Sequence, residues 1–157
     1  MATRTRRRFD SLHQEVFLSM WRTYDRLRAV EEELFARFDL TPQQYNALRL
    51  LAAAQPKTIR TLDLAARLVS RAPDITRLLD KLAERGLIAR DRPATNRRVV
   101  DVGITPAGIA LLHELRDPLR ACHRKQLGHL PTRKLKALVL LLQDAREPHE
   151  HPSSTWR

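Results

Sequence analysis

The stretch of residues 68–104, LVSRAPDITRLLDKLAERGLIARDRPATNRRVVDVGI, decides the fold of this chain. It predicts a helix over residues 73–85, in which Pro73 suits the first turn because the N–H that proline lacks is not needed there. Asp74 favours the positive end of that helix, and Ser70 is the candidate for its cap. The apolar face of the helix recurs at helical spacing through Ile75, Leu78, Leu79 and Leu82.

A basic hairpin follows this helix. Gly86 ends the helix as a residue that tolerates positive φ, and residues 87–89 and 99–104 then predict two short strands. The loop between them, residues 90–98, holds four arginines against one acid. The polar face of the helix carries Thr76, Arg77, Lys81 and Arg85. A basic helix face beside a basic hairpin is typical of a helix in a DNA groove with a wing on the neighbouring backbone.

The quoted stretch resembles the winged helix-turn-helix of the MarR family of bacterial transcription regulators. The matching pieces are PDITRLLDKLAERGLI, NRRVVDVGITPAG and the earlier run LTPQQYNALRLL at residues 40–51, and a looser likeness covers most of residues 12–146. The family usually has Asp-Arg-Arg where this chain has Asn96, Arg97 and Arg98. The resemblance implies a mostly α protein with a small β-hairpin wing and long N- and C-terminal dimerisation helices.

The formal net charge of +11 predicts a polyanionic partner. Residues 1–8 carry a net charge of +4 and residues 57–98 carry +6, whereas residues 9–56 carry −2. A basic surface that merely keeps the protein soluble is the alternative. Solubility does not require the excess to lie on one motif, so double-stranded DNA is the expected partner.

Length and composition exclude several classes of protein. A chain of 157 residues fits one compact subunit, and four glycines with 5% aromatics argue against an all-β fold. It has no run of 18 apolar residues, and its N-terminus lacks the apolar segment of a secretory signal, so no membrane partner is expected. The single Cys122 excludes an internal disulfide framework and fits a reducing cytoplasm, the expected location.

Long apolar stripes predict a dimer. The first helix, residues 9–38, has a stripe too broad for one small lobe to cover, and two further helices follow between residues 108 and 146. Pro118 is expected to kink or break the first of these two. The expected organisation is a disordered basic tail (1–8), a dimerisation region (9–38 and 108–146), a winged DNA-binding lobe (40–105) and a flexible tail (147–157).

Two shorter helices precede the quoted stretch. Thr41 and Pro42 predict the cap and first position of a helix that runs to about Ala54. A third helix is expected over residues 59–68, with Leu62, Ala65, Ala66 and Leu68 facing inward. Arg60 lies at its entry, where a helix end and a cation both suit a phosphate.

The expected DNA contacts follow from these elements. Arg77 is the candidate reader of a base edge, although an ion pair with Asp74 or Asp80 is the alternative for its side chain. The resemblance favours Arg98 for a minor groove, held by a neutral hydrogen bond from Asn96. The full set of candidate DNA-binding residues is Arg60, Pro73, Asp74, Thr76, Arg77, Lys81, Arg97 and Arg98.

No constellation in the sequence predicts catalysis. The chain has no glycine-rich phosphate loop, GxSxG, HExxH or CxxC, so neither an enzyme nor a cofactor is expected. Its histidines are scattered, which argues against a metal site. Cys122 lies on an apolar stripe and is interpreted as a buried small hydrophobe rather than a redox switch.

The resemblance also implies a response to a small aromatic or phenolic effector. Trp21, Tyr24 and Tyr45 are candidates to line its cleft, and packing in the core is the alternative role for them. The main hypothesis is a homodimeric repressor that a small molecule releases from a palindromic operator. An architectural DNA-binding protein of low specificity and a protein-binding winged-helix adaptor are the other interpretations.

Overall fold

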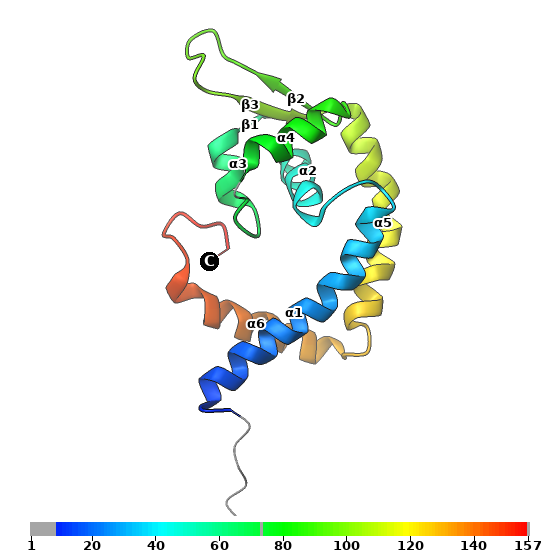
Figure 1. Cartoon of the computed structure of the whole chain (residues 1–157), viewed down its shortest axis with the longest axis vertical. Helices are drawn as coiled ribbons and strands as arrows, with labels where there is room; N and C mark the ends of the chain where they lie inside the picture. Colours follow the sequence, from blue (N-terminus) through cyan, green and yellow to red (C-terminus); the bar gives the residue numbers. More distant parts are fainter. Residues whose placement is uncertain (1–8, 73, 157) are drawn as a thin grey trace, which may run out of the picture.

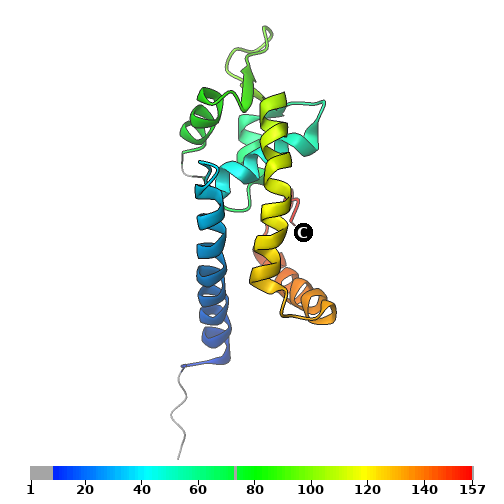
Figure 2. The ribbon, with the colours of Figure 1, turned by 90° about the vertical axis from the view of Figure 1, so that its right-hand side faces the viewer.

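Two long helices lie side by side and carry a small lobe at one end (Figures 1 and 2). The computed structural model describes residues 9–72 and 74–156. The long helices are α1 (Leu12–Ala36) and α5 (Pro106–Leu127), and α6 (Thr132–Arg146) crosses the far end and leads into a 3-10 helix, Glu147–His149. The lobe contains α2 (Pro42–Ala54), β1 (Ile59–Arg60), α3 (Thr61–Arg67), α4 (Ile75–Glu84), β2 (Ile88–Asp91) and β3 (Asp101–Ile104).

The junction between α1 and α2 follows local sequence signals. Helix α1 is shorter at both ends than the predicted 9–38, because Ser11 caps its start and Asp39 turns the chain with a φ of 51°. The predicted cap of α2 is confirmed: the Thr41 hydroxyl accepts from the Gln44 N–H, and the Gln44 side chain accepts from the Thr41 N–H. This reciprocal arrangement satisfies two donors that a helix start otherwise leaves unpaired.

The sheet has one strand more than the sequence predicted. Its order is β1-β3-β2, all antiparallel, with Ile59 opposite Val102 in the β1–β3 pair. The predicted helix over residues 59–68 was therefore wrong at its start, since Ile59 and Arg60 form β1 and α3 begins at Thr61. Ile59 and Arg60 are in the sheet because they pair with Val102 and Asp101 on β3. A strand of two residues is too short to show a periodic pattern in the sequence, so this long-range pairing could not be predicted from it.

The wing is also longer at its first strand than predicted. Strand β2 covers Ile88–Asp91 rather than residues 87–89, and β3 begins only at Asp101. Val99 instead belongs to a turn, in which its N–H donates to the Asn96 carbonyl. The loop between the two strands projects away from the rest of the lobe (Figure 1).

Helix α4 has the expected amphipathic character but a later start. It runs over Ile75–Glu84 rather than residues 73–85, with Asp74 and not Ser70 as its N-cap. Pro73 lies outside the described residues. Gly86 follows the helix with a φ of 68°, as predicted for its end.

The core of the lobe joins helices to the sheet. Its fully buried side chains are Phe35, Leu48, Leu51, Leu64, Leu79, Leu82, Val102 and Leu115. Leu62 and Ala66 were expected to face inward, but both are exposed, Leu62 to 81%. Because α3 begins at Thr61, Leu64 is buried in their place, and Leu68 is buried as expected.

The far ends of the long helices present apolar residues to solvent. Helix α5 continues through Pro118 without a break. None of the residues of α6 is buried, and its exposed large residues are Leu138, Val139, Leu140, Leu141 and Leu142. On α1 the exposed set is Leu12, Val16, Phe17, Leu18, Met20, Trp21 and Tyr24. Among the described residues, no helix combines the length and the hydropathy that a membrane span requires.

Candidate nucleic-acid interface and ligand cleft

Helix α4 divides cleanly into a core face and a solvent face. Leu78, Leu79 and Leu82 are buried, while Thr76, Arg77 and Lys81 are exposed. The Asp74 carboxylate accepts from the backbone N–H of Arg77 at 2.9 Å, which caps the helix and leaves the Arg77 side chain unused. The solvent face therefore offers hydroxyl, guanidinium and ammonium donors from consecutive turns.

An ion pair connects this helix to the wing. The Arg90 guanidinium on β2 lies 2.6 Å from the Asp80 carboxylate on α4. Asp80 is thus engaged by Arg90, and Arg77 makes no ion pair with any residue in the described part of the chain. The alternative of an intrahelical ion pair for Arg77 is not realised in this structure.

The wing presents its arginines to solvent. Arg97 and Arg98 are both exposed, close to the tip of the hairpin. The Asn96 side chain accepts from the backbone N–H of Arg98 at 3.1 Å. The expected hydrogen bond from Asn96 to the Arg98 guanidinium is therefore not the one observed, because Asn96 bonds to the backbone of Arg98 and shapes the turn.

Arg60, the remaining candidate for a DNA contact, lies between the sheet and α3. Arg60 ends β1, is exposed and occupies the cap position of α3. Next to it, the Thr61 N–H and hydroxyl both donate to the Val100 carbonyl, at 3.0 and 3.2 Å. Arg60 is therefore placed at the base of the wing, on the edge strand of the sheet.

Arg85 connects α4 to the end of α1, a contact that the sequence did not predict. Its guanidinium donates to the Phe38 carbonyl at 3.1 Å and to the Asp39 carbonyl. A cation at this position complements the negative end of helix α1. The orientation of α4 is therefore tied to the α1–α2 corner.

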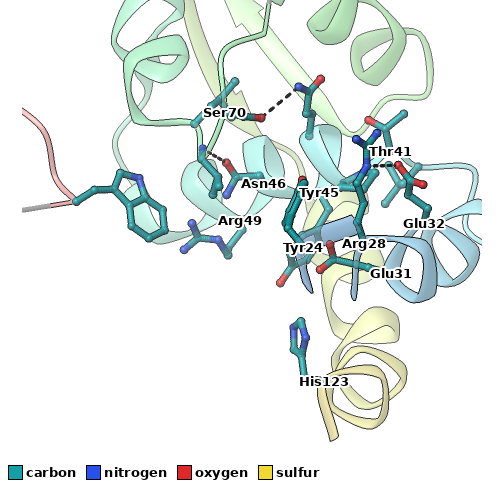
Figure 3. A pocket seen from close by; sticks show the side chains of 16 residues that line it. Tyr24, Arg28, Glu31, Glu32, Thr41, Tyr45, Asn46, Arg49, Ser70 and His123 are labelled. Carbon is teal, nitrogen blue, oxygen red and sulfur yellow. Dashed lines mark hydrogen bonds and ion pairs between the residues drawn. The ribbon is translucent and has the colours of Figure 1, made fainter. Parts of the chain in front are cut away.

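An open cleft lies beneath the lobe, between α1, α2 and α5 (Figure 3). Its volume is about 910 Å³, and the candidate residues Tyr24 and Tyr45 line it. Trp21 does not line it, because that ring lies further along α1, 63% exposed and in an edge-to-face contact with Phe17 at 6.3 Å. The expected aromatic set is thus reduced to the two tyrosines.

The chemistry of the cleft is mixed. Arg49 and His123 face it beside the two rings, and Arg28 lies at the wall in an ion pair with Glu32 at 2.5 Å. Tyr45 also stacks on Phe35 at 4.9 Å, so it has both the core role and the lining role considered for it. Burial raises the pKa of Tyr45, whose phenol is protonated at neutral pH even at its ordinary pKa and can donate a hydrogen bond.

Comparison with known proteins identifies the family. Residues 40–100 match the MarR family. A crystal structure of a MarR transcription factor from Planctomyces limnophilus is 54% identical, with 87% of this chain and 98% of that chain covered and a TM-score of 0.70. This chain belongs to the MarR family. The predicted fold, a mostly helical winged helix-turn-helix, is confirmed, and the family consists of transcription regulators rather than enzymes.

Two further relatives agree with this identification. The homoprotocatechuate degradative operon repressor of Escherichia coli is 23% identical, with 85% of this MarR-family chain and 88% of the repressor covered. A mutant MarR from Escherichia coli, solved in complex with operator DNA, has the same fold with a TM-score of 0.74 at 21% identity, over 87% of this chain and 99% of that chain.

The single cysteine of this MarR-family regulator should react slowly. Cys122 is buried on α5, and its burial, followed by the Glu31 carboxylate, raises the pKa of the thiol. A raised pKa leaves less thiolate at a given pH, so iodoacetamide should alkylate the native protein more slowly at pH 8 than the protein in urea. Equal rates in the two states would contradict the buried, inert assignment.

Sequence reasoning missed the residues that connect elements. Arg85, Arg90 and Asn46 act through partners 46, 10 and 23 positions away, respectively. Asn46 alone carried a usable signal, because it is a polar residue among the apolar positions of α2. The charges of the other two could not be distinguished from those of a solvated surface.

Proposed function

We propose that this chain is a sequence-specific repressor that binds a palindromic operator as a homodimer and is released by a small aromatic effector. One observation carries the proposal: the exposed face of α4, with Thr76, Arg77 and Lys81, lies beside a basic wing in a chain of the MarR family. Its relatives include a repressor and a MarR protein solved with operator DNA, which supports the same function.

The proposed DNA contacts are of two kinds, contacts to base edges in the grooves and contacts to backbone phosphates. Helix α4 enters the major groove, where the Arg77 guanidinium donates two hydrogen bonds to a guanine edge. Thr76 and Lys81 lie on the same face of the helix, and Asp74 lies at its start. Arg60 holds a phosphate at the base of the wing. Arg97 and Arg98 approach the adjacent minor groove, whose negative potential favours a guanidinium.

The dimer is proposed from the uncovered apolar residues. Trp21 on α1 and Leu141 on α6 are 63% and 65% exposed, and each belongs to the set of exposed large apolar residues on its helix. Exposed apolar patches of this kind mark interaction surfaces. A two-fold partner that contributes the same helices, residues 9–38 and 108–146, would cover both sets and place two copies of α4 on the DNA.

The effector is proposed from the lining of the cleft. Tyr24 and Tyr45 offer ring faces, while Arg49 and His123 offer cationic or donor groups on the same cavity. An aromatic carboxylate or phenol would satisfy both kinds of group, since ligand sites combine apolar walls with a few placed polar groups. The volume of about 910 Å³ is ample for such a molecule.

A competition assay tests the proposal. A regulator should prefer its operator over random DNA by about 10³-fold or more at physiological salt. The labelled operator fragment would be titrated with protein in the presence of unlabelled random duplex. Equal competition by operator and random duplex would instead assign the chain to architectural DNA binding.

The wing gives a further prediction, since Asn96 replaces the acid that is usual in the family. An Asn96→Asp carboxylate can still accept from the Arg98 N–H, so the turn should persist and operator affinity should change by less than about threefold. Arg98→Ala should weaken operator binding by about 1–3 kcal/mol, because a groove contact is lost. Fluorescence anisotropy at one fixed salt concentration measures both variants.

The opposite pattern would contradict this account of the wing. If Asn96→Asp weakened binding and Arg98→Ala left it unchanged, the Arg98 guanidinium would remain in solvent in the complex. Arg92, exposed on the same hairpin loop, provides the matched control, since Arg92→Ala removes an equal charge from a position with no assigned groove contact.

A further inference from the structure

A buried amide connects the wall of the cleft to the chain that leads into α4. Among the described residues only Gln44 and Asn46 are polar and buried, and Gln44 is accounted for by the cap of α2. Asn46 has a different partner: its Oδ1 accepts from the backbone N–H of Val69 at 2.9 Å (Figure 3). The bond joins α2 to the turn between α3 and α4.

The same contact belongs to the lining of the cleft. Asn46, Val69 and Ser70 all line it. Gln43 adds two longer bonds from α2, in which its side-chain nitrogen lies 3.4 Å from the Ser70 hydroxyl and 3.4 Å from the Arg71 carbonyl. The residues that an occupant of the cleft would touch therefore hold the turn that ends at the Asp74 cap of α4.

We propose that Asn46 is a positioning residue that transmits occupancy of the cleft to α4. The inference rests on the proposed function, which takes α4 as the reader of DNA and the cleft as the effector site. A carboxylate in the cleft would accept from the side-chain nitrogen of Asn46 and draw the amide away from Val69. The turn would then lose its anchor, and the entry end of α4 would no longer be fixed for contact with base edges.

This arrangement needs no contact between effector and DNA. The ligand favours the state in which the Asn46–Val69 bond is broken, the operator favours the state in which it is made, and each therefore weakens the binding of the other. Couplings of this kind change affinity by about 5- to 150-fold.

Two variants of Asn46 separate positioning from packing. Asn46→Leu keeps a side chain of similar size but removes the acceptor for the Val69 N–H, so operator affinity should fall by about tenfold without any ligand. Asn46→Asp keeps an oxygen acceptor for that N–H and loses the amide donor, so operator affinity should stay within about threefold of the parent chain while binding of a carboxylate ligand weakens.

Salicylate serves as the probe ligand. Its affinity for the protein alone is measured by titration calorimetry, and the operator dissociation constant is measured with and without saturating salicylate. In the parent chain salicylate should raise that constant about tenfold. Asn46→Leu also lacks the amide donor, so salicylate should bind it more weakly, and at saturation it should raise the operator dissociation constant by less than about twofold. Full coupling in Asn46→Leu would overturn the proposal.

Amide hydrogen exchange gives a test that depends on no variant. In the parent chain the Val69 amide should exchange faster when salicylate is bound, whereas the amide of Leu51 in the core of α2 should not change. Unchanged exchange at Val69 with salicylate bound would overturn the proposal.

Failure of the proposed function is recognised separately. Absence of preferential operator binding by the parent chain removes the DNA-reading role itself. Should salicylate not bind, the effector role of the cleft loses its support, and the ligand-free arm decides the role of Asn46: operator affinity unchanged in a folded Asn46→Leu would overturn it, and a loss confined to Asn46→Leu and absent from Asn46→Asp would support it.

Discussion

Replacing Leu141 by glutamate should turn the proposed dimer into a monomer and weaken operator binding by about a hundredfold or more. Leu141 is 65% exposed on α6, a helix with no buried residue of its own. In a two-fold dimer this leucine would lie in the interface, where an unpaired carboxylate costs several kcal/mol in each protomer. A monomer keeps one copy of α4 and loses the second half-site contact.

Sedimentation equilibrium at micromolar concentration measures the first effect. The parent chain should show about twice the chain mass of 18.2 kDa, and the Leu141→Glu variant should show the mass of one chain. Leu62→Glu is the matched control for assembly, because Leu62 is 81% exposed but lies on α3, away from the two apolar sets. A parent chain that stays monomeric, or a variant that stays dimeric, would contradict the proposed interface.

Arg77→Ala should cost about 1–3 kcal/mol of operator affinity and relax the preference at one position in each half-site. The substitution should leave the cap of α4 intact, because Asp74 accepts from the backbone N–H of Arg77 and not from its side chain. Since Arg77 has no ion pair in the described structure, its removal leaves no acid unpaired. The loss can therefore be assigned to DNA contact rather than to stability.

The contrast with Arg60 sharpens this prediction. Arg60→Ala should weaken binding to all sequences alike and reduce the salt slope by about one per site, as expected of a phosphate contact. Arg133→Ala on α6 removes the same charge far from the lobe and should leave the operator preference unchanged. Loss of only nonspecific affinity in both Arg77→Ala and Arg60→Ala would show that α4 is not the reader.

The parts of the fold that the sequence predicted are those set by near neighbours. Thr41 caps a helix three residues ahead of its partner, Gly86 takes the positive φ that its lack of a side chain allows, and the leucines of α4 repeat at helical spacing. Each of these features depends on interactions within one or two turns. The resemblance to the MarR family rested on the same local patterns and is confirmed by the comparisons.

The parts that were missed depend on contacts between distant segments. Strand β1 exists only because Ile59 meets Val102, and Arg85 reaches the end of α1 only once the lobe has folded. Trp21 and Tyr24 looked equivalent as candidates for the cleft, yet only Tyr24 lines it, because the two rings lie at different places along α1. The spacing of aromatic residues in the sequence does not show which of them will line a cleft formed by several helices.

Selection of bound sequences from a random DNA pool tests the central claim most directly. The account predicts enrichment of one palindrome whose half-sites lie about one helical turn apart, or a multiple of it, since two copies of α4 must enter successive major grooves. The same selection with Arg77→Ala should lose information at one position in each half. A pool that shows no enriched sequence, or an enriched site without two-fold symmetry, would contradict the account.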